Sequence, residues 1–196
     1  MTRTRWLQVG GVVLVFAVAA WIASSILERV VSPAPAPSTA PTPAAPAASV
    51  PHIIATLYYG TADGQALAAV KREVPLGEGP REQGRQILQS ELEDAPAPYL
   101  SLIPRGTTLR AFYITDRGDA FVDLSAEAST LHPGGSTHEL LTVYAIVNAV
   151  TANLSSVERV QILIDGRQAD TLAGHVDLRR PFERDTVLVR ETKGTQ

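Results

Sequence analysis

The sequence predicts an α+β domain over residues 52–190, in which one mixed, mostly antiparallel sheet carries two helices on one face. Runs rich in β-branched and aromatic residues alternate with two helical patterns in the order β-β-α-β-β-α-β. Short turn sequences join several of the runs, as is typical of antiparallel hairpins. A domain of this length can bury one core without a metal or a disulfide.

Two hairpins and a fifth strand are predicted from these runs. The Asp63-Gly64 turn separates the first two arms, and Asp116-Arg117-Gly118 separates the next two. The fifth strand ends at the Asp165-Gly166 turn, and a last short strand or loop is expected to place Leu172 and Leu178 on the core. The five predicted strands are residues 53–59, 67–76, 107–115, 119–125 and 157–165.

Each predicted helix has its own start signal. Pro80 suits the first turn of a helix whose Ile87 and Leu88 share a face, and Pro96 marks its end. In the second helix, Ser136 and Glu139 have the spacing of a capping box, in which each side chain bonds the other residue's backbone N–H. A broad apolar stripe follows, made of Leu140, Val143, Tyr144, Val147, Val150 and Leu154.

An apolar segment precedes the domain. Residues 7–27 carry no charge, and a helix of that length spans the roughly 30 Å hydrocarbon core of a bilayer. Arg3 and Arg5 come before it, so residues 1–6 are expected in the cytoplasm and everything after residue 27 outside it. We therefore predict a single-pass anchor in a bacterial inner (cytoplasmic) membrane. A cleaved signal peptide is the alternative, although its apolar region is usually only about 7–15 residues long.

Residues 28–51 are predicted to form a disordered linker rich in proline and alanine. Extended at about 3.1 Å per residue, it would reach on the order of 60 Å. Residues 191–196 are predicted to be a frayed tail.

Composition excludes several functional classes. The chain has no cysteine, which excludes a disulfide framework, a zinc–thiolate site, a thiol nucleophile and an acylated lipoprotein cysteine. The net charge of −3 argues against nucleic acid as a partner. His132 and His138 are six residues apart, which does not match the i, i+4 pairing of a helical metal site. No Gly-x-Ser-x-Gly turn is present. We therefore predict no enzyme activity, no cofactor and no metal.

Six sequence blocks follow one another along the domain: LYYG, LIPRGT, FVDLS, GGSTHELLTVYAIVNAVTANL, VQILIDG and LAGHVDL with Arg184. In this order they resemble the GerMN domain of sporulation and germination proteins, over residues 53–184. The resemblance implies a non-enzymatic cell-envelope module with a fold similar to ring-building motifs. The sporulation protein of this family carries two copies behind a lipid anchor, whereas this chain has room for one copy and lacks the cysteine.

Two functions are open as hypotheses. The leading one is an anchored scaffold or assembly module that binds envelope proteins or copies of itself. The alternative is a module that binds cell-wall glycan (peptidoglycan) or a small ligand and modulates wall enzymes, with Tyr58, Tyr59, Tyr99 or Tyr113 stacking on sugars. The candidate interaction surface consists of Asp123, Ser125, Gly134, Gly135, Ser136 and His138.

Overall fold

The computed structural model of the chain describes residues 51–190. The predicted anchor (7–27), the predicted linker up to residue 50 and the predicted tail (191–196) lie outside the described residues. None of the helices in residues 51–190 combines the length and the hydropathy that a membrane span requires.

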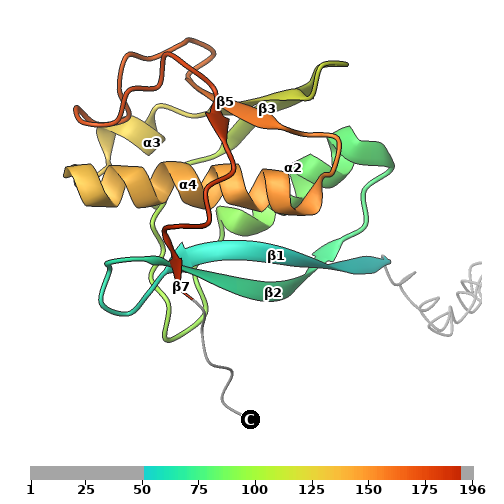
Figure 1. The fold of residues 1–196 in the computed structure, drawn as a ribbon, viewed down its shortest axis with the longest axis horizontal. Helices are drawn as coiled ribbons and strands as arrows, with labels where there is room; N and C mark the ends of the chain where they lie inside the picture. Colours follow the sequence, from blue (N-terminus) through green and yellow to red (C-terminus); the bar gives the residue numbers. More distant parts are fainter. Residues whose placement is uncertain (1–50, 191–196) are drawn as a thin grey trace, which may run out of the picture. The chain divides into compact units, whose positions relative to one another are not determined.

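Two sheets and three helices make up the domain (Figure 1). The first sheet has the order β1-β2-β7, with β1 at His52–Gly60, β2 at Leu67–Pro75 and β7 at Val189–Arg190. The second sheet has the order β3-β4-β5-β6, with β3 at Leu109–Ile114, β4 at Asp119–Leu124, β5 at Arg159–Ile164 and β6 at Phe182–Glu183. The helices are α2 (Gly79–Glu91), α3 (Glu127–Thr130) and α4 (Ser136–Asn153).

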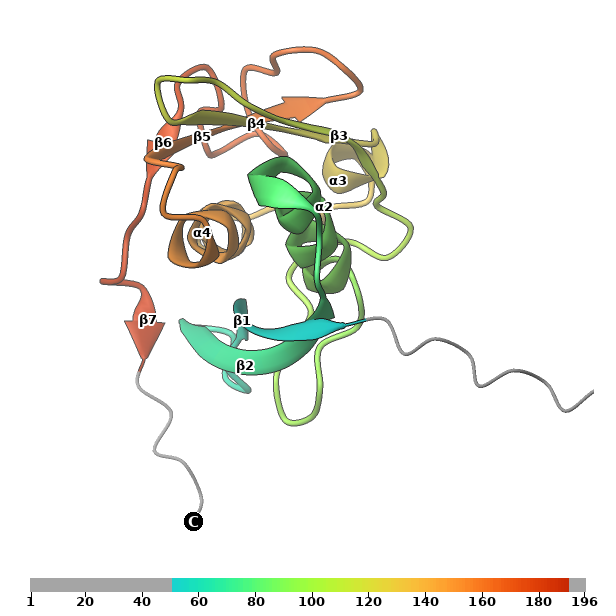
Figure 2. The same cartoon turned by 90° about the vertical axis from the view of Figure 1, so that its right-hand side faces the viewer.

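The elements form three layers, with α2 and α4 lying between the two sheets (Figure 2). The prediction of one sheet with two helices on one face is therefore wrong, although the α+β class and the mixed strand directions are confirmed. The β1–β2 hairpin builds its own sheet with β7. The β3–β4 hairpin continues into β5, which is parallel to β4 because α4 connects the two strands as a crossover.

Helix α4 is enclosed on both sides, which explains the middle layer. The predicted stripe is only part of its buried surface: Leu140 and Tyr144 are half-buried, while Leu141, Ala145 and Ile146, outside the stripe, are about 1% exposed. A helix that is apolar on nearly every side must be covered on more than one face. Residues 140–150 are aliphatic except for Thr142, Tyr144 and Asn148, and this composition carries the information in the sequence.

The predicted hairpins are confirmed, and the smaller elements were not foreseen. The strand pairs run from His52↔Pro75 to Gly60↔Leu67 and from Leu109↔Leu124 to Ile114↔Ala120. Residues 171–178 form a loop that buries Leu172 and Leu178, in line with the loop alternative. α3, β6 and β7 were not predicted, because each is four residues or fewer and leaves no periodic pattern in the sequence.

Side chains occupy the outer edge of β1. Asn153, the last residue of α4, accepts from the Thr56 N–H (2.9 Å) and donates to the Thr56 carbonyl (2.8 Å). Glu91, the last residue of α2, accepts from the Tyr58 N–H (3.1 Å). The backbone groups of Gly60 pair with Leu100. These contacts take the positions that a further strand would need.

Candidate functional site

One end of the second sheet brings the predicted surface residues into one region. Strands β4 and β5 are parallel and end together, with Leu124 paired to Ile164. The chain leaves β4 through α3 and enters α4, so the N-terminus of α4 lies at the same end as these strand ends (Figure 1). Loops, not the middle of the sheet, therefore form the candidate site.

Asp123 fastens the turn that follows β5. It is 7% exposed, and its carboxylate accepts from the Gly166 N–H (2.7 Å) and from Arg110 Nε (3.3 Å). Arg110 also donates to Asp165 at 2.6 Å. Asp123 therefore holds the loop after β5, which follows a different strand from its own.

Ser125 joins the end of β4 to the start of the β3 arm. Its hydroxyl accepts from the Thr108 N–H (2.9 Å), and its own N–H donates to the Thr108 carbonyl (3.0 Å). Within the described residues, no hydrogen bond or ion pair connects Asp123 or Ser125 to residues 134–138. The predicted surface thus consists of two separately held groups.

The entry to α4 differs from the predicted capping box. Gly135 is the N-cap residue, and Ser136 is already the first residue of the helix, with no side-chain cap bond. Gly134 and Gly135 have φ values of 78° and 89°, a conformation that favours glycine. The Glu139 N–H donates to the Gly135 carbonyl (2.9 Å), so the predicted partnership of Ser136 with Glu139 is wrong. Glu139 instead forms hydrogen bonds with the loop at residues 173–176.

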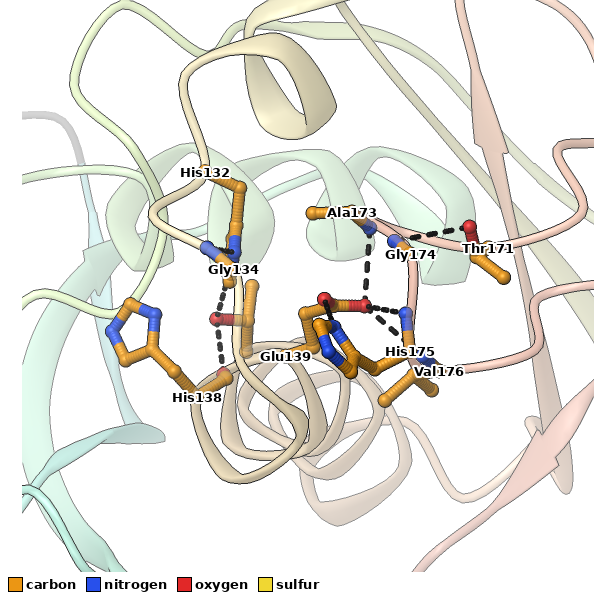
Figure 3. Close-up of polar contacts among 10 residues, drawn as sticks. His132, Gly134, His138, Glu139, Thr171, Ala173, Gly174, His175 and Val176 are labelled. Carbon is orange, nitrogen blue, oxygen red and sulfur yellow. Dashed lines mark hydrogen bonds and ion pairs between the residues drawn. The ribbon is translucent and has the colours of Figure 1, made fainter.

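Glu139 binds the loop at residues 173–176 (Figure 3). Its side chain is fully buried and accepts four hydrogen bonds. Three come from the backbone N–H groups of Ala173 (3.1 Å), His175 (3.0 Å) and Val176 (3.0 Å). The fourth joins Oε1 to Nδ1 of His175 at 2.7 Å. We call Glu139 with residues 173–176 the Glu139 clamp.

These bonds fix the charge of Glu139. Burial alone would raise its pKa, because an ionised carboxylate loses its hydration. The bonds from Val176, His175 and Ala173 outweigh burial and lower the pKa of Glu139 from 4.5 to about 2. Glu139 is therefore an anion at neutral pH, held by donors that are already in place.

His132 and His138 pack against each other beside the clamp, with their ring centroids 4.8 Å apart (Figure 3). Nδ1 of His132 accepts from the Gly134 N–H (3.0 Å), so Nε2 carries the proton and lies 3.0 Å from the Thr142 hydroxyl. Burial lowers the pKa of His132, and His138 and Glu139 modify it further in opposite directions. Burial also lowers the pKa of His138. His132 thus acts as a neutral linker between the α3–α4 loop and α4.

The Glu139 clamp was not predicted from the sequence. Glu139 and its partners are 34–37 residues apart, and a local capping pattern offered a sufficient explanation. The available signal was the glycine in the LAGHVDL block. Gly174 has φ 114°, and around it the backbone N–H groups of Ala173, His175 and Val176 all point to one carboxylate.

Other candidate chemistry has little support in the described residues. Between residues 51 and 190, no three His, Cys, Asp or Glu side chains lie in a position to hold a metal ion. Tyr58 and Tyr59 are 3% and 2% exposed, so they cannot stack on a sugar. Tyr113 is exposed, but the Arg81 guanidinium lies 5.0 Å from its ring centroid.

A shallow pocket lies between the start of α2 and the end of α4, away from the clamp. Its volume is about 360 Å³. Two of its polar side chains are already used, since Gln83 bonds Gly77 and Pro75, and Asn153 bonds Thr56. The lining contains no acidic, basic or histidine side chain, and consists of Gly77, Gly79, Pro80, Gln83, Asn153, Leu154, Ser155 and Ser156.

Comparison with known proteins connects this fold to other chains. A Clostridium perfringens protein described as a candidate lipoprotein is 26% identical, with a TM-score of 0.50 over 70% of this chain and 91% of that one. The tandem GerMN domains of the sporulation protein GerM from Bacillus subtilis are 20% identical, with a TM-score of 0.52. That match covers 69% of this chain and 46% of the tandem protein. No curated protein matches the chain.

The family comparison agrees with the structural one. The family model for Germane, described as sporulation and spore germination, matches residues 56–170, which is more than half of the sequence. The resemblance to a GerMN domain is confirmed. The chain therefore belongs to the Germane family.

Proposed function

We propose that this chain is a non-enzymatic protein of the bacterial cell envelope whose Germane-family domain works as an assembly or scaffolding module. The proposed contact surface is the N-terminal end of α4 together with the loop that Glu139 binds. Gly134, Gly135, Ser136 and His138 contribute from the helix entry, and Asp123 and Ser125 support the neighbouring strand end.

One observation carries the proposal: the polar side chains at this end hold loops in place. Asp123 binds the turn after β5, His132 binds the helix entry, and Glu139 binds residues 173–176. A catalytic site needs groups that are free to meet a substrate. Here the same groups make the loops rigid, which lowers the conformational entropy that binding a protein partner would cost.

We further propose that residues 7–27 anchor the protein in the cytoplasmic membrane, with the domain outside the cytoplasm. The C. perfringens relative is described as a candidate lipoprotein, which supports tethering at a membrane. This chain has no cysteine to acylate, so an apolar helix would replace the lipid. Residues 28–51 would then set the distance between the membrane and the domain.

Site-specific photocrosslinking in cells tests the contact surface. A photoreactive residue at Ser136 should yield a discrete adduct with an envelope protein, because Ser136 is exposed on the proposed surface. The matched control is Ser155, an exposed serine beside the pocket at the other end of α4. Equal patterns from both positions, or no adduct from Ser136, would contradict the proposal.

Topology reporters test the anchor. Alkaline phosphatase fused after residue 51 should be active, and green fluorescent protein fused there should be dark, because the domain lies outside the cytoplasm. A fusion that shows the reverse activities would refute the proposed orientation.

A further inference from the structure

Strand β2 has a stretch of outer edge that nothing in the described chain covers. β7 pairs only with Leu67 and Ala68, and the Leu67 N–H donates to the Leu188 carbonyl. Alternate residues of a strand point their backbone groups to the same side, so those of Lys71 and Glu73 also point away from β1. Between residues 51 and 190, no group bonds to them there.

This edge contrasts with that of β1 in the same sheet. Asn153, Glu91 and Leu100 occupy the outer edge of β1, as described above. Along β2, the side chains of Lys71 and Glu73 are exposed and in no ion pair with another described residue. Of these two long edges, β2 is the one that can accept another strand.

The charged side chains on this edge, Lys71 and Glu73, are complementary to those on the same edge of a second copy. Lys71 and Glu73 are two residues apart and therefore lie on the same face of the strand. If two copies of β2 run antiparallel about Arg72, Lys71 of each lies opposite Glu73 of the other. We propose that a second copy of this chain pairs with β2 in that register, which joins two three-stranded sheets into one. The inference rests on the proposed assembly function and names its partner.

The register fits the surroundings of the strand. The Arg72 guanidinium donates to the Tyr59 hydroxyl (2.9 Å) and bonds Glu93 (3.1 Å), so two symmetry-related arginines are already engaged within their own copies. Pro75 of one copy falls opposite Ala69 of the other. β2 ends at Pro75, and β7 pairs with β2 only at Leu67 and Ala68. The incoming strand would therefore pair with residues 69–75 and stop beside the last β7 pair, Ala68↔Arg190.

Cysteine crosslinking tests this register. The full-length chain contains no cysteine, so any disulfide comes from introduced residues. Lys71→Cys and Glu73→Cys, carried on two differently tagged full-length copies in the same cells, should form a mixed-tag disulfide dimer. Lys71→Cys paired with Ile54→Cys is the matched control, because Ile54 is exposed on β1. A mixed dimer in the control at the same yield, or none from positions 71 and 73, would overturn the proposal.

Charge reversal provides a second readout, measured as self-association of the full-length protein in detergent. Lys71→Glu places like charges opposite each other at both symmetry-related positions and should weaken the dimer by about tenfold. The double variant Lys71→Glu with Glu73→Lys restores both pairs and should return to the wild-type affinity. Equal weakening in the single and double variants would contradict the register. The Ser136 adduct does not depend on this edge, so its persistence would leave the proposed function standing while this inference falls.

Discussion

Two buried glutamates, one on each long helix, show how the same side chain acquires opposite charge preferences. Glu139 near the start of α4 is 0% exposed, and Glu91 at the end of α2 is 3% exposed. Glu139 receives four hydrogen bonds, whereas Glu91 receives one, from the Tyr58 N–H. Burial raises the pKa of Glu91 well above its usual value, and its single bond and Arg72 do not compensate. The number of donors, not burial, decides the charge.

The largest expected effect is that of Glu139→Gln. The amide keeps the shape but turns an NH₂ group towards backbone donors and removes the charge that they stabilise. We expect a loss of about 3 kcal/mol in the free energy of unfolding, measured by urea denaturation at pH 7. Asp177→Asn is the control in the same loop, because Asp177 is exposed and its side chain bonds Arg179, not Glu139; its cost should be much smaller than that of Glu139→Gln. Similar losses in both variants would contradict the clamp.

The pH dependence of this effect follows from the lowered pKa of Glu139. The unfolded carboxyl titrates near 4.5 and the folded one near 2. Its stabilising contribution is therefore complete above pH 4.5 and is lost as the pH falls towards 2. The difference in unfolding free energy between wild type and Glu139→Gln should shrink over this interval. A difference that stays constant down to pH 2.5 would show that Glu139 is not an ionised acceptor.

A smaller effect is expected for His175→Ala. The His175 side chain is 49% exposed and supplies one of the four bonds, while the three backbone donors remain. We expect a loss of about 1 kcal/mol, with amide hydrogen exchange at Ala173 and Val176 still slow. Fast exchange at both amides would mean that the imidazole, not the backbone, maintains the clamp.

The smallest change in the free energy of unfolding should come from Glu91→Gln at pH 5. We expect it to stay within about 0.5 kcal/mol, because the amide oxygen can still accept from the Tyr58 N–H. The raised pKa of Glu91 means that its contribution is fully present below pH 4.5 and is lost as the pH rises through the folded value. The variant should therefore become more stable relative to wild type as the pH increases. Denaturation at pH 5, 7 and 9 measures this trend, and a flat or opposite trend would contradict it.

The local sequence pattern predicts the hairpins and the two long helices, but it does not predict how they pack into two sheets. The turns at Asp63-Gly64 and Asp116-Gly118 lie where the sequence predicts them, because glycine and aspartate determine short loops directly. The division into two sheets depends on which hairpin packs on which side of α4. That choice depends on contacts between residues far apart in the chain, which periodicity does not encode.

In the candidate site, too, the roles that depend on distant contacts could not be predicted from the sequence. The start of α4 at Ser136 was correctly predicted, because its signals are local in the sequence. The role of Glu139 was not, since its donors come from Ala173 to Val176 and a capping box explained the residue equally well. Asn153 and Glu91 were not identified either, because their task of occupying the edge of β1 exists only once the strand lies beside the two helices.

The bond between Asn153 and Thr56 has a mechanical consequence. Traction on the chain ahead of His52 would peel β1 from β2 one residue pair at a time, starting at His52↔Pro75. After four pairs the separation reaches Thr56, whose N–H and carbonyl are both hydrogen-bonded to Asn153, the last residue of α4. Further extension must then disturb the middle layer of the domain. Under the proposed anchoring, this bond would confine the effect of tension on the linker to the first few residues of β1.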